Sequence, residues 1–282
     1  MILVDSNSIC HAAKHNMGDL SWNDKKVGVM FGFLRQLLSL AKMLETNEFA
    51  FAWDSRSSKR TDIFPDYKKA RRREKTPEEE ELDTIAYIQF DKLRTEILPS
   101  LGFTNNFMQE GYEADDIIAS VVHSNPSKKI NIISADEDLY QLLSELVNMY
   151  SIKKKQFYTH INLWKEYRIV PIDWVEVKAI AGCSTDGIPG VPGVGEKTAC
   201  KYLSRRLNPI YKTYQAIIGS KKLIDKNREL VKLPLAGTSA YPIKSNGNLS
   251  YSNFVDICGE YGFASFLERD ALRKWKEIIF QE

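Results

Sequence analysis

The 282-residue sequence predicts an α/β fold in which a mostly parallel central sheet is flanked by helices and followed by a helical C-terminal subdomain. Short apolar runs alternate with segments of helical periodicity up to about residue 160, which is typical of β-α-β units. Beyond Pro171 the helical pattern dominates, and Gly and Pro become more frequent. We therefore place a domain boundary near residue 165 and expect two units, residues 1–165 and 166–282.

The expected strands are short apolar runs bounded by polar or turn-forming residues. They cover residues 2–4, 49–53, 103–108, 130–133, 146–152 and 156–161. Helical periodicity is strongest over residues 27–44, 82–97 and 117–122, and further helices are expected to begin near Leu139 and Glu196. Pro99 and Gly102 predict the end of the helix at residues 82–97.

Composition restricts the class of protein. With 43% hydrophobic and 27% charged residues, the chain is an ordinary globular one, which excludes a fibrous or wholly disordered protein. No apolar run approaches the ~18 residues of a membrane span, so we expect neither a membrane span nor a secretory signal. The four cysteines are far apart and form no C-x-x-C pair, so we expect neither a paired-cysteine zinc site nor disulfides, and a reduced, cytoplasmic compartment.

The net charge of +2 conceals a local concentration of basic residues. Between Lys59 and Lys75 there are eight basic and three acidic residues, with Phe64 and Tyr67 among them. Cations beside aromatic rings suit a strand of nucleic acid, where they meet phosphates and stack on bases. The alternative is a solvated helical face that pairs with the acidic run at residues 78–81.

Carboxylates recur where predicted strands end and where one predicted helix begins. The residues concerned are Asp5, Asp54 and Asp136 after strands, and Glu113, Asp115 and Asp116 at the helix start. The carboxyl ends of strands in an α/β sheet border the ligand crevice, so these acids should converge. Crowded carboxylates repel unless cations such as Mg²⁺ or Mn²⁺ neutralise them. Each acid alone could be a helix cap or turn residue, but their repetition favours a metal site.

A glycine-rich turn at residues 182–199 is the most specific motif of the chain. Gly190, Gly193 and Gly195 allow another molecule to approach the backbone closely, and a helix is expected to begin at Glu196. The free N–H groups at that helix start suit a phosphate and read no base. The alternative is a packing motif between two helices.

Together these motifs resemble the 5′-nucleases of the flap-endonuclease superfamily, most closely phage 5′–3′ exonucleases and the 5′-nuclease domain of bacterial DNA polymerase I. The resemblance extends over nearly the whole chain. It rests on Val4-Asp5-Ser6-Asn7, Trp53-Asp54, Tyr67-Lys68-Lys69-Ala70-Arg71, Tyr112-Glu113-Ala114-Asp115-Asp116, Ser134-Ala135-Asp136-Glu137-Asp138, Val177-Lys178-Ala179-Ile180 and the turn from Ile188 to Ala199.

The resemblance implies two sites for Mg²⁺ or Mn²⁺, each held by acidic residues. The first would be formed or surrounded by Asp5, Asp54, Glu113, Asp115 and Asp116, and the second by Asp136, Asp138 and Asp186. It also implies a helical arch over about residues 60–100, at whose base Tyr67, Lys68 and Arg71 would steer the scissile phosphate.

The resemblance further implies contacts with DNA in the C-terminal subdomain. Lys178 would contact a phosphate, and the glycine turn would grip duplex DNA as part of a helix–three-turn–helix that often carries K⁺. The residues of the turn assigned to DNA are Gly190, Gly193, Gly195, Lys197 and Thr198.

One position departs from the family pattern. Family members usually have Gly-Asp where this chain has Gly182-Cys183, so the second metal site lacks one carboxylate. A thiol is a poor ligand for a hard, oxygen-seeking ion. We expect cleavage to be retained with weaker binding of the second metal.

The implied activity is a metal-dependent 5′–3′ exonuclease and flap endonuclease that hydrolyses DNA to 5′-phosphate products in replication or repair. The expected partner is DNA with 5′ ends or flaps, with RNA primers left open, and the chain is expected to act as a monomer, in a host cytoplasm if it is phage-encoded. One alternative is a branched-DNA-binding protein of the same fold with little catalysis, because of Cys183. A metal ribonuclease fits less well, since it needs neither the glycine turn nor the basic segment.

Overall fold

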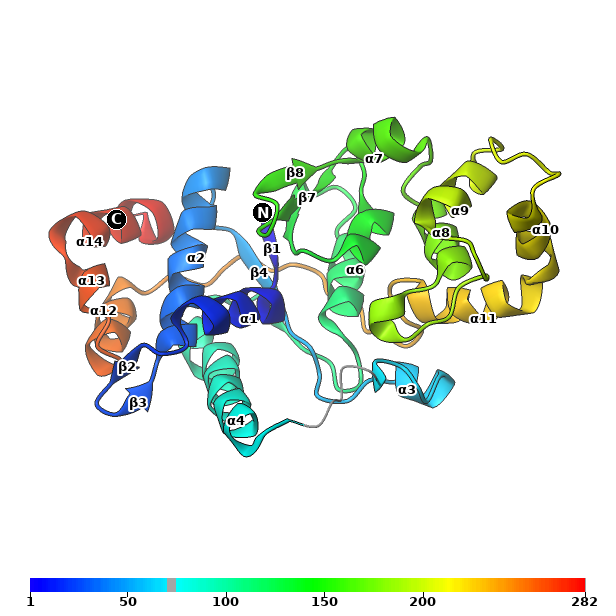
Figure 1. Cartoon of the computed structure of the whole chain (residues 1–282). Coiled ribbons are helices and arrows are strands. Elements are labelled where there is room, and N and C mark those ends of the chain that lie inside the picture. The colour runs from blue at the N-terminus through cyan, green and yellow to red at the C-terminus, as the bar shows by residue number, and fades with distance from the viewer. Residues whose placement is uncertain (70–74, 282) are drawn as a thin grey trace.

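The computed structural model describes residues 1–69 and 75–281 (Figure 1). Its centre is a six-stranded sheet of order β5-β4-β1-β6-β7-β8. Neighbouring strands are parallel except for β8, which is antiparallel to β7. The strands are β1 (Ile2–Asp5), β4 (Phe49–Ala52), β5 (Asn106–Phe107), β6 (Ile130–Ile133), β7 (Val147–Ser151) and β8 (Gln156–Tyr158). The predicted α/β fold with a mostly parallel sheet is confirmed.

The two faces of the sheet carry different side chains because strand residues alternate in direction. In β4, Ala50 and Ala52 belong to the core that contains α6 (Ala114–Ser124), whereas Phe49 and Phe51 belong to the opposite core, with α1 (Ser6–Met17) and α2 (Gly28–Leu44). The small alanines let α6 pack directly on β1 and β4. Helices therefore cover both faces, as a parallel sheet requires.

Several N-terminal elements differ from the sequence prediction in extent. The α1 helix was not predicted, and neither was the hairpin of β2 (Ser21–Trp22) and β3 (Lys25–Lys26). The α4 helix (Pro77–Lys92) begins before residue 82 because Thr76 and Glu79 form a capping box, and it continues through the π-helical segment Leu93–Ile97 into α5 (Leu98–Ser100). The helix expected near Leu139 is a 3₁₀ helix, Glu137–Leu142.

The segment between β4 and α4 lies beside the acidic edge of the sheet. It contains α3 (Arg60–Ile63) and the turn residues up to Lys69. The α4 helix itself contacts α1 and α2. Because residues 70–74 lie outside the described part, the arch over about residues 60–100 stays a prediction.

The C-terminal half is helical, as predicted, and its helices occupy two places (Figure 1). The first group is α7 (His160–Tyr167), α8 (Asp173–Ala181), the 3₁₀ turn Ser184–Asp186, α9 (Glu196–Leu203), α10 (Lys212–Gly219) and α11 (Lys221–Val231). The second is α12 (Tyr251–Glu260), α13 (Ala264–Leu267), α14 (Arg269–Trp275) and the π-helical end Lys276–Phe280. The second group packs into the core that contains α2. The domain boundary at residue 165 stays a prediction.

No helix within the described ranges combines the length and the apolar character that crossing a membrane requires.

Candidate active site

The predicted acids lie at one edge of the sheet because β1, β4 and β6 are parallel neighbours. Asp5 is the last residue of β1, and Asp54 and Asp136 follow β4 and β6 closely. The strands that follow β1 in sequence, β4 and β5, extend the sheet on one side of it, and the later strands β6 to β8 extend it on the other. Such a switch point opens a crevice at the carboxyl ends of the strands. Three acids distant in sequence thus share one small region.

Asp5 is held in place by two hydrogen bonds. The backbone N–H of Ser8 donates to its carboxylate at 3.0 Å, and the Ser134 hydroxyl donates at 2.8 Å. The first bond makes Asp5 the N-cap of α1, so the positive end of that helix faces the site. Burial and the nearby charge of Asp54 nevertheless raise the pKa of Asp5 to about 7. The site therefore lacks enough positive charge to balance its carboxylates.

The amino end of α6 supplies two further carboxylates. Glu113 is the N-cap residue, and Asp115 lies in the first turn. The Ala114 N–H donates to Asp54 at 2.7 Å, which ties the end of β4 to the start of α6. The sheet and α6 are thereby fixed relative to each other at the point where the acids meet.

Asp115 is the acid most affected by its neighbours. Burial and the charges of Asp136, Asp5 and Asp54 raise the pKa of Asp115 well above its ordinary value. Each of these carboxylates therefore lies close enough to destabilise the charge of Asp115. A bound cation would remove that repulsion.

Asp116 does not join this group, although the resemblance assigned it to the first metal. It is fully buried and forms a two-pronged ion pair with Arg60, at 2.6 and 2.8 Å. It also accepts hydrogen bonds from the backbone N–H groups of Leu235 and Glu113. Both of its oxygens accept hydrogen bonds from these donors, and Asp116 ties α6 to Arg60 and Leu235. Its assignment to the first metal stays a prediction.

Basic and phenolic groups from the segment before α4 surround Glu113. The Tyr67 hydroxyl and the Lys68 ammonium each donate to the Glu113 carboxylate at 2.9 Å, and Arg60 lies 3.5 Å from it. Burial alone would raise the pKa of Glu113, but the charges of Lys68 and Arg60 outweigh burial and lower this pKa. Burial disfavours the charged form of Lys68, but Glu113 and Asp186 outweigh this effect and raise its pKa. Lys68 thus carries a positive charge among the acids.

Lys68 also fixes the segment to the C-terminal helices. Its backbone has a positive φ of 53°, and its N–H donates to the Asp186 carbonyl at 2.7 Å. Arg71, the third residue assigned to phosphate steering, lies outside the described residues.

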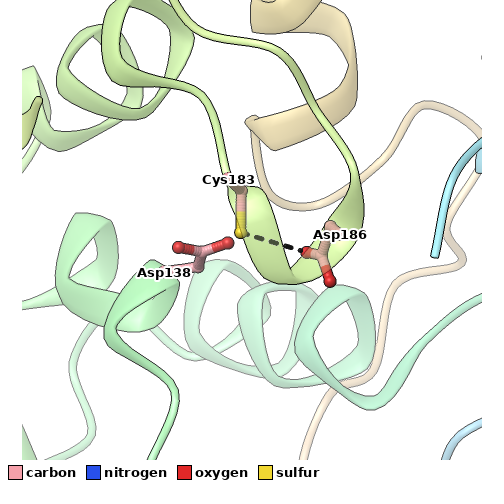
Figure 2. Close-up of side chains that lie close together, drawn as sticks. All are labelled: Asp138, Cys183 and Asp186. Atoms are coloured by element: carbon pink, nitrogen blue, oxygen red, sulfur yellow. Dashed lines mark hydrogen bonds between the residues drawn. The ribbon is translucent and has the colours of Figure 1, made fainter. Parts of the chain in front are cut away.

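The second predicted cluster is formed by Asp138, Cys183 and Asp186 (Figure 2). One ligand atom from each residue lies within 4.8 Å of the others. The Cys183 thiol donates to Asp186 at 3.5 Å and lies 3.1 Å from the Thr185 hydroxyl. Burial raises the pKa of Cys183, with further contributions from Asp186 and Asp138, so the group is a neutral thiol.

Lys178 is buried between two acids rather than open to solvent. Its ammonium lies 2.8 Å from Asp138 and 2.8 Å from Glu196, the first residue of α9. Burial opposes its charge, but both acids raise the pKa of Lys178. In this state Lys178 links the second cluster to the helix that follows the glycine turn.

Acids from both clusters line one cavity of about 20 Å³, which is room for an ion or a water molecule. Five carboxylates line it, from Glu113, Asp115, Asp136, Asp138 and Asp186, against the two cations of Arg60 and Lys68. Both cations are engaged with Glu113. The remaining acids supply oxygen ligands in excess of positive charge, which fits hard divalent ions such as Mg²⁺ or Mn²⁺.

The glycine turn is tightly packed at Gly190 and exposed to open space at Gly193 and Gly195. A side chain at Gly190 would collide with the Ala181 carbonyl, at 1.9 Å, so this glycine is needed for packing. Gly193 has a positive φ of 75°, and both it and Gly195 face open space. The open glycines leave the start of α9 accessible.

The side chains after the turn differ in access. Lys197 is exposed and Thr198 is partly exposed. Gly195, the N-cap residue of α9, offers no side chain to the first N–H groups of the helix. The N–H groups of Thr198 and Ala199 donate to the Gly195 carbonyl, so the N–H groups of Glu196 and Lys197 are the donors that suit an external acceptor such as a phosphate.

The family described as 5′–3′ exonuclease, N-terminal resolvase-like domain, matches residues 1–168. The chain belongs to this family. DNA polymerase I of Bacillus subtilis (strain 168) is 30% identical over 292 residues, which covers 95% of this chain and 32% of the polymerase. The 5′–3′ exonuclease of the same organism is 31% identical over 204 residues, or 70% of this chain and 64% of that protein. This family member thus spans about a third of the polymerase and under two thirds of that exonuclease.

Solved structures of a phage T5 nuclease share the fold. The T5 protein co-crystallized with metal ions is 25% identical with a TM-score of 0.71, covering 83% of this chain and 89% of that chain. The bacteriophage T5 flap endonuclease in a pseudo-enzyme–product complex with DNA and metal ions is 22% identical with a TM-score of 0.68, covering 99% and 97%. The predicted resemblance to this family is confirmed.

Two residues of this 5′–3′ exonuclease family member were missed in the sequence. Arg60 was one of eight similar basic residues, and its spacing did not separate it from the others. Glu196 was read as a helix start, and nothing in the sequence indicated its ion pair with Lys178. Both depend on contacts between distant segments.

Asp116 and Asp115 should respond oppositely to neutralisation, measured by urea unfolding in EDTA at pH 8. We expect Asp116→Asn to destabilise the protein by about 3–5 kcal/mol, because Arg60 would be left buried without its anionic partner. We expect Asp115→Asn to raise the free energy of unfolding by roughly 1 kcal/mol, because repulsion is relieved.

The experiment is done at pH 8 because folding raises the pKa of Asp115. A carboxyl whose pKa is raised by folding costs no stability below its unfolded value and its full cost above its folded value. The gain from Asp115→Asn should therefore shrink as the pH falls. Destabilisation by both variants would contradict the conclusion that Asp115 is repelled by its neighbours whereas Asp116 is stabilised by Arg60.

Proposed function

We propose that this chain is a divalent-metal-dependent 5′-nuclease that hydrolyses DNA phosphodiesters at 5′ ends and flaps, leaving 5′-phosphate products. The observation that carries the proposal is the cavity in which carboxylates exceed cations and Lys68 lies among them. Membership of the 5′–3′ exonuclease family supports it. The activity is proposed because the chain matches only part of its relatives.

The residues suited to hold metal divide into two groups. Asp5, Asp54, Glu113 and Asp115 would surround the first ion, with Asp136 between the two positions, and Asp138 and Asp186 would serve the second. The T5 relative co-crystallized with metal ions supports a metal-ion cofactor, and the carboxylate ligands of this chain favour Mg²⁺ or Mn²⁺ as that ion. When bound, such ions activate water and stabilise the charge that develops on the phosphate.

The protein groups would position the substrate. The Lys68 ammonium can leave Glu113 and bind a phosphate oxygen, since it lies at the cavity wall and is partly exposed. Burial and the Glu113 charge raise the pKa of Tyr67, so its hydroxyl stays protonated and available as a donor. Arg71, which is close in sequence, is proposed for the same role.

Duplex DNA would lie along the glycine turn. The open backbone at Gly193 and Gly195, the start of α9 and the exposed Lys197 and Thr198 suit phosphate contacts without base reading. We assign this element to the helix–three-turn–helix of the family, with a K⁺ site, within a C-terminal unit beginning near residue 166. Gly190 and Lys178 would support the element from within, since the first is needed for packing and the second is buried.

A second function, binding of branched DNA with little cleavage, is favoured by one observation only. Cys183 occupies the second cluster where the family usually has an acid. A neutral thiol removes one negative charge from that cluster, which weakens its attraction for Mg²⁺.

Cleavage of a 5′-labelled DNA flap separates the two functions. We expect cut products with Mg²⁺ or Mn²⁺ and none in EDTA, while binding to the same DNA in Ca²⁺ or EDTA is retained at low salt. Binding without products at every concentration of Mg²⁺ and Mn²⁺ would select the binding protein instead.

Lys68→Ala should separate catalysis from binding. We expect the single-turnover cleavage rate to fall by roughly 100-fold or more, because one charge-assisted contact to the phosphate is lost, while duplex affinity changes little. Lys69→Ala is the matched control, since Lys69 is exposed and pairs only with Asp66 among the described residues. Equal losses of cleavage and affinity in Lys68→Ala would refute the assigned role.

Restoring the family acid should strengthen use of Mg²⁺. We expect Cys183→Asp to raise the cleavage rate at low Mg²⁺, since a third carboxylate joins Asp138 and Asp186. The measurement is the Mg²⁺ concentration at half-maximal rate, compared with Cys183→Asn, which adds no charge. An unchanged Mg²⁺ requirement would show that Cys183 does not limit the second site.

A further inference from the structure

The cluster of Asp138, Cys183 and Asp186 combines two kinds of ligand atom. Figure 2 shows the three side chains directed toward a common space, with the Cys183 sulfur between the two carboxylates. Metal–sulfur and metal–oxygen bonds of about 2.3 and 2.1 Å place neighbouring donors of a tetrahedral ion roughly 3.5 Å apart. The three ligand atoms all lie within 4.8 Å of one another, so side-chain movements of about 1 Å bring them to one ion.

The cluster carries less negative charge than three carboxylates would, which weakens its hold on a hard ion. Two carboxylates remain, and Lys178 offsets one of them because its ammonium lies 2.8 Å from Asp138. Mg²⁺ is held by charged oxygen ligands, whereas sulfur ligands favour softer ions of the zinc type. For an ion of the zinc type, the Cys183 sulfur can therefore serve as the third ligand in place of a carboxylate. For Mg²⁺ it cannot.

We propose that Cys183 turns the second metal position into a mixed sulfur–oxygen site that takes an ion of the Zn²⁺ and Co²⁺ class in preference to Mg²⁺. This inference rests on the proposed function for the presence of an ion there. On binding, the Cys183 S–H bond breaks, a metal–sulfur bond forms, and the proton now shared with Asp186 passes to solvent. No electron is transferred.

The other three cysteines are not expected to bind the metal ion. Cys10, Cys200 and Cys258 are buried, and among the described residues Cys183 alone belongs to a metal-sized group of acids and cysteines. A sulfur–metal signal from this protein can therefore be traced to Cys183 by substitution.

Absorption spectroscopy of the metal-free, DNA-free full chain titrated with Co²⁺ tests the proposal. We expect a sulfur-to-cobalt charge-transfer band in the near ultraviolet that Zn²⁺ removes at comparable concentration and that Mg²⁺ in ~1,000-fold excess leaves in place. Cys183→Ser should lose the band, and Cys258→Ser should retain it. Asp186→Asn, which keeps the thiol, should weaken the Co²⁺ affinity reported by the band by about tenfold or more.

Three results would overturn the proposal. They are absence of the band in the wild type while Co²⁺ raises its melting temperature, persistence of the band in folded Cys183→Ser, and removal of the band by Mg²⁺. Because the band is measured without DNA, its outcome is independent of cleavage. A band without nuclease activity refutes the proposed function alone, and Mg²⁺-driven cleavage without a band refutes the sulfur site alone.

Discussion

Repulsion between carboxylates crowded at one edge of the sheet is the constraint around which this site is built. The parallel arrangement of β1, β4 and β6 forces Asp5, Asp54 and Asp136 toward one edge, and α6 adds Asp115. Hydrogen bonds from Ser8 and Ser134 reduce this cost at Asp5 without removing it, since the pKa of Asp5 is still raised. The fold thus holds a deficit of positive charge that a cation can fill.

Two buried ion pairs hold the surroundings of that site together. Arg60 and Asp116 connect the segment after β4 to α6, and both also bond to backbone groups beyond residue 229, at Leu230 and Leu235. A buried pair of this kind is costly to break, so it fixes relative position more than it adds stability. The scaffold for the acids therefore includes parts of the chain far from them in sequence.

Lys178 forms a comparable link on the other side of the cavity. Its ammonium contacts both Asp138, in the second cluster, and Glu196, at the start of α9. The acidic site and the glycine turn are therefore connected through one side chain. Substitution of Asp138 or Glu196 therefore removes one of the two ion pairs of Lys178, and so weakens the link between the second cluster and α9.

The α/β class could be predicted from the sequence, because alternating apolar runs and helical periods are local patterns. The sequence also indicated the residues around the site, because Asp5, Asp54 and Asp136 each follow a strand, and such acids meet only if the strands are parallel neighbours. Only the tertiary structure separated Asp116 from Asp115, which lies next to it. Adjacent residues on a helix point in different directions, and the partner that claims Asp116 is Arg60, 56 residues away. The same reason applies to Lys178: its local sequence allowed a phosphate contact, and long-range packing gave it two acidic partners.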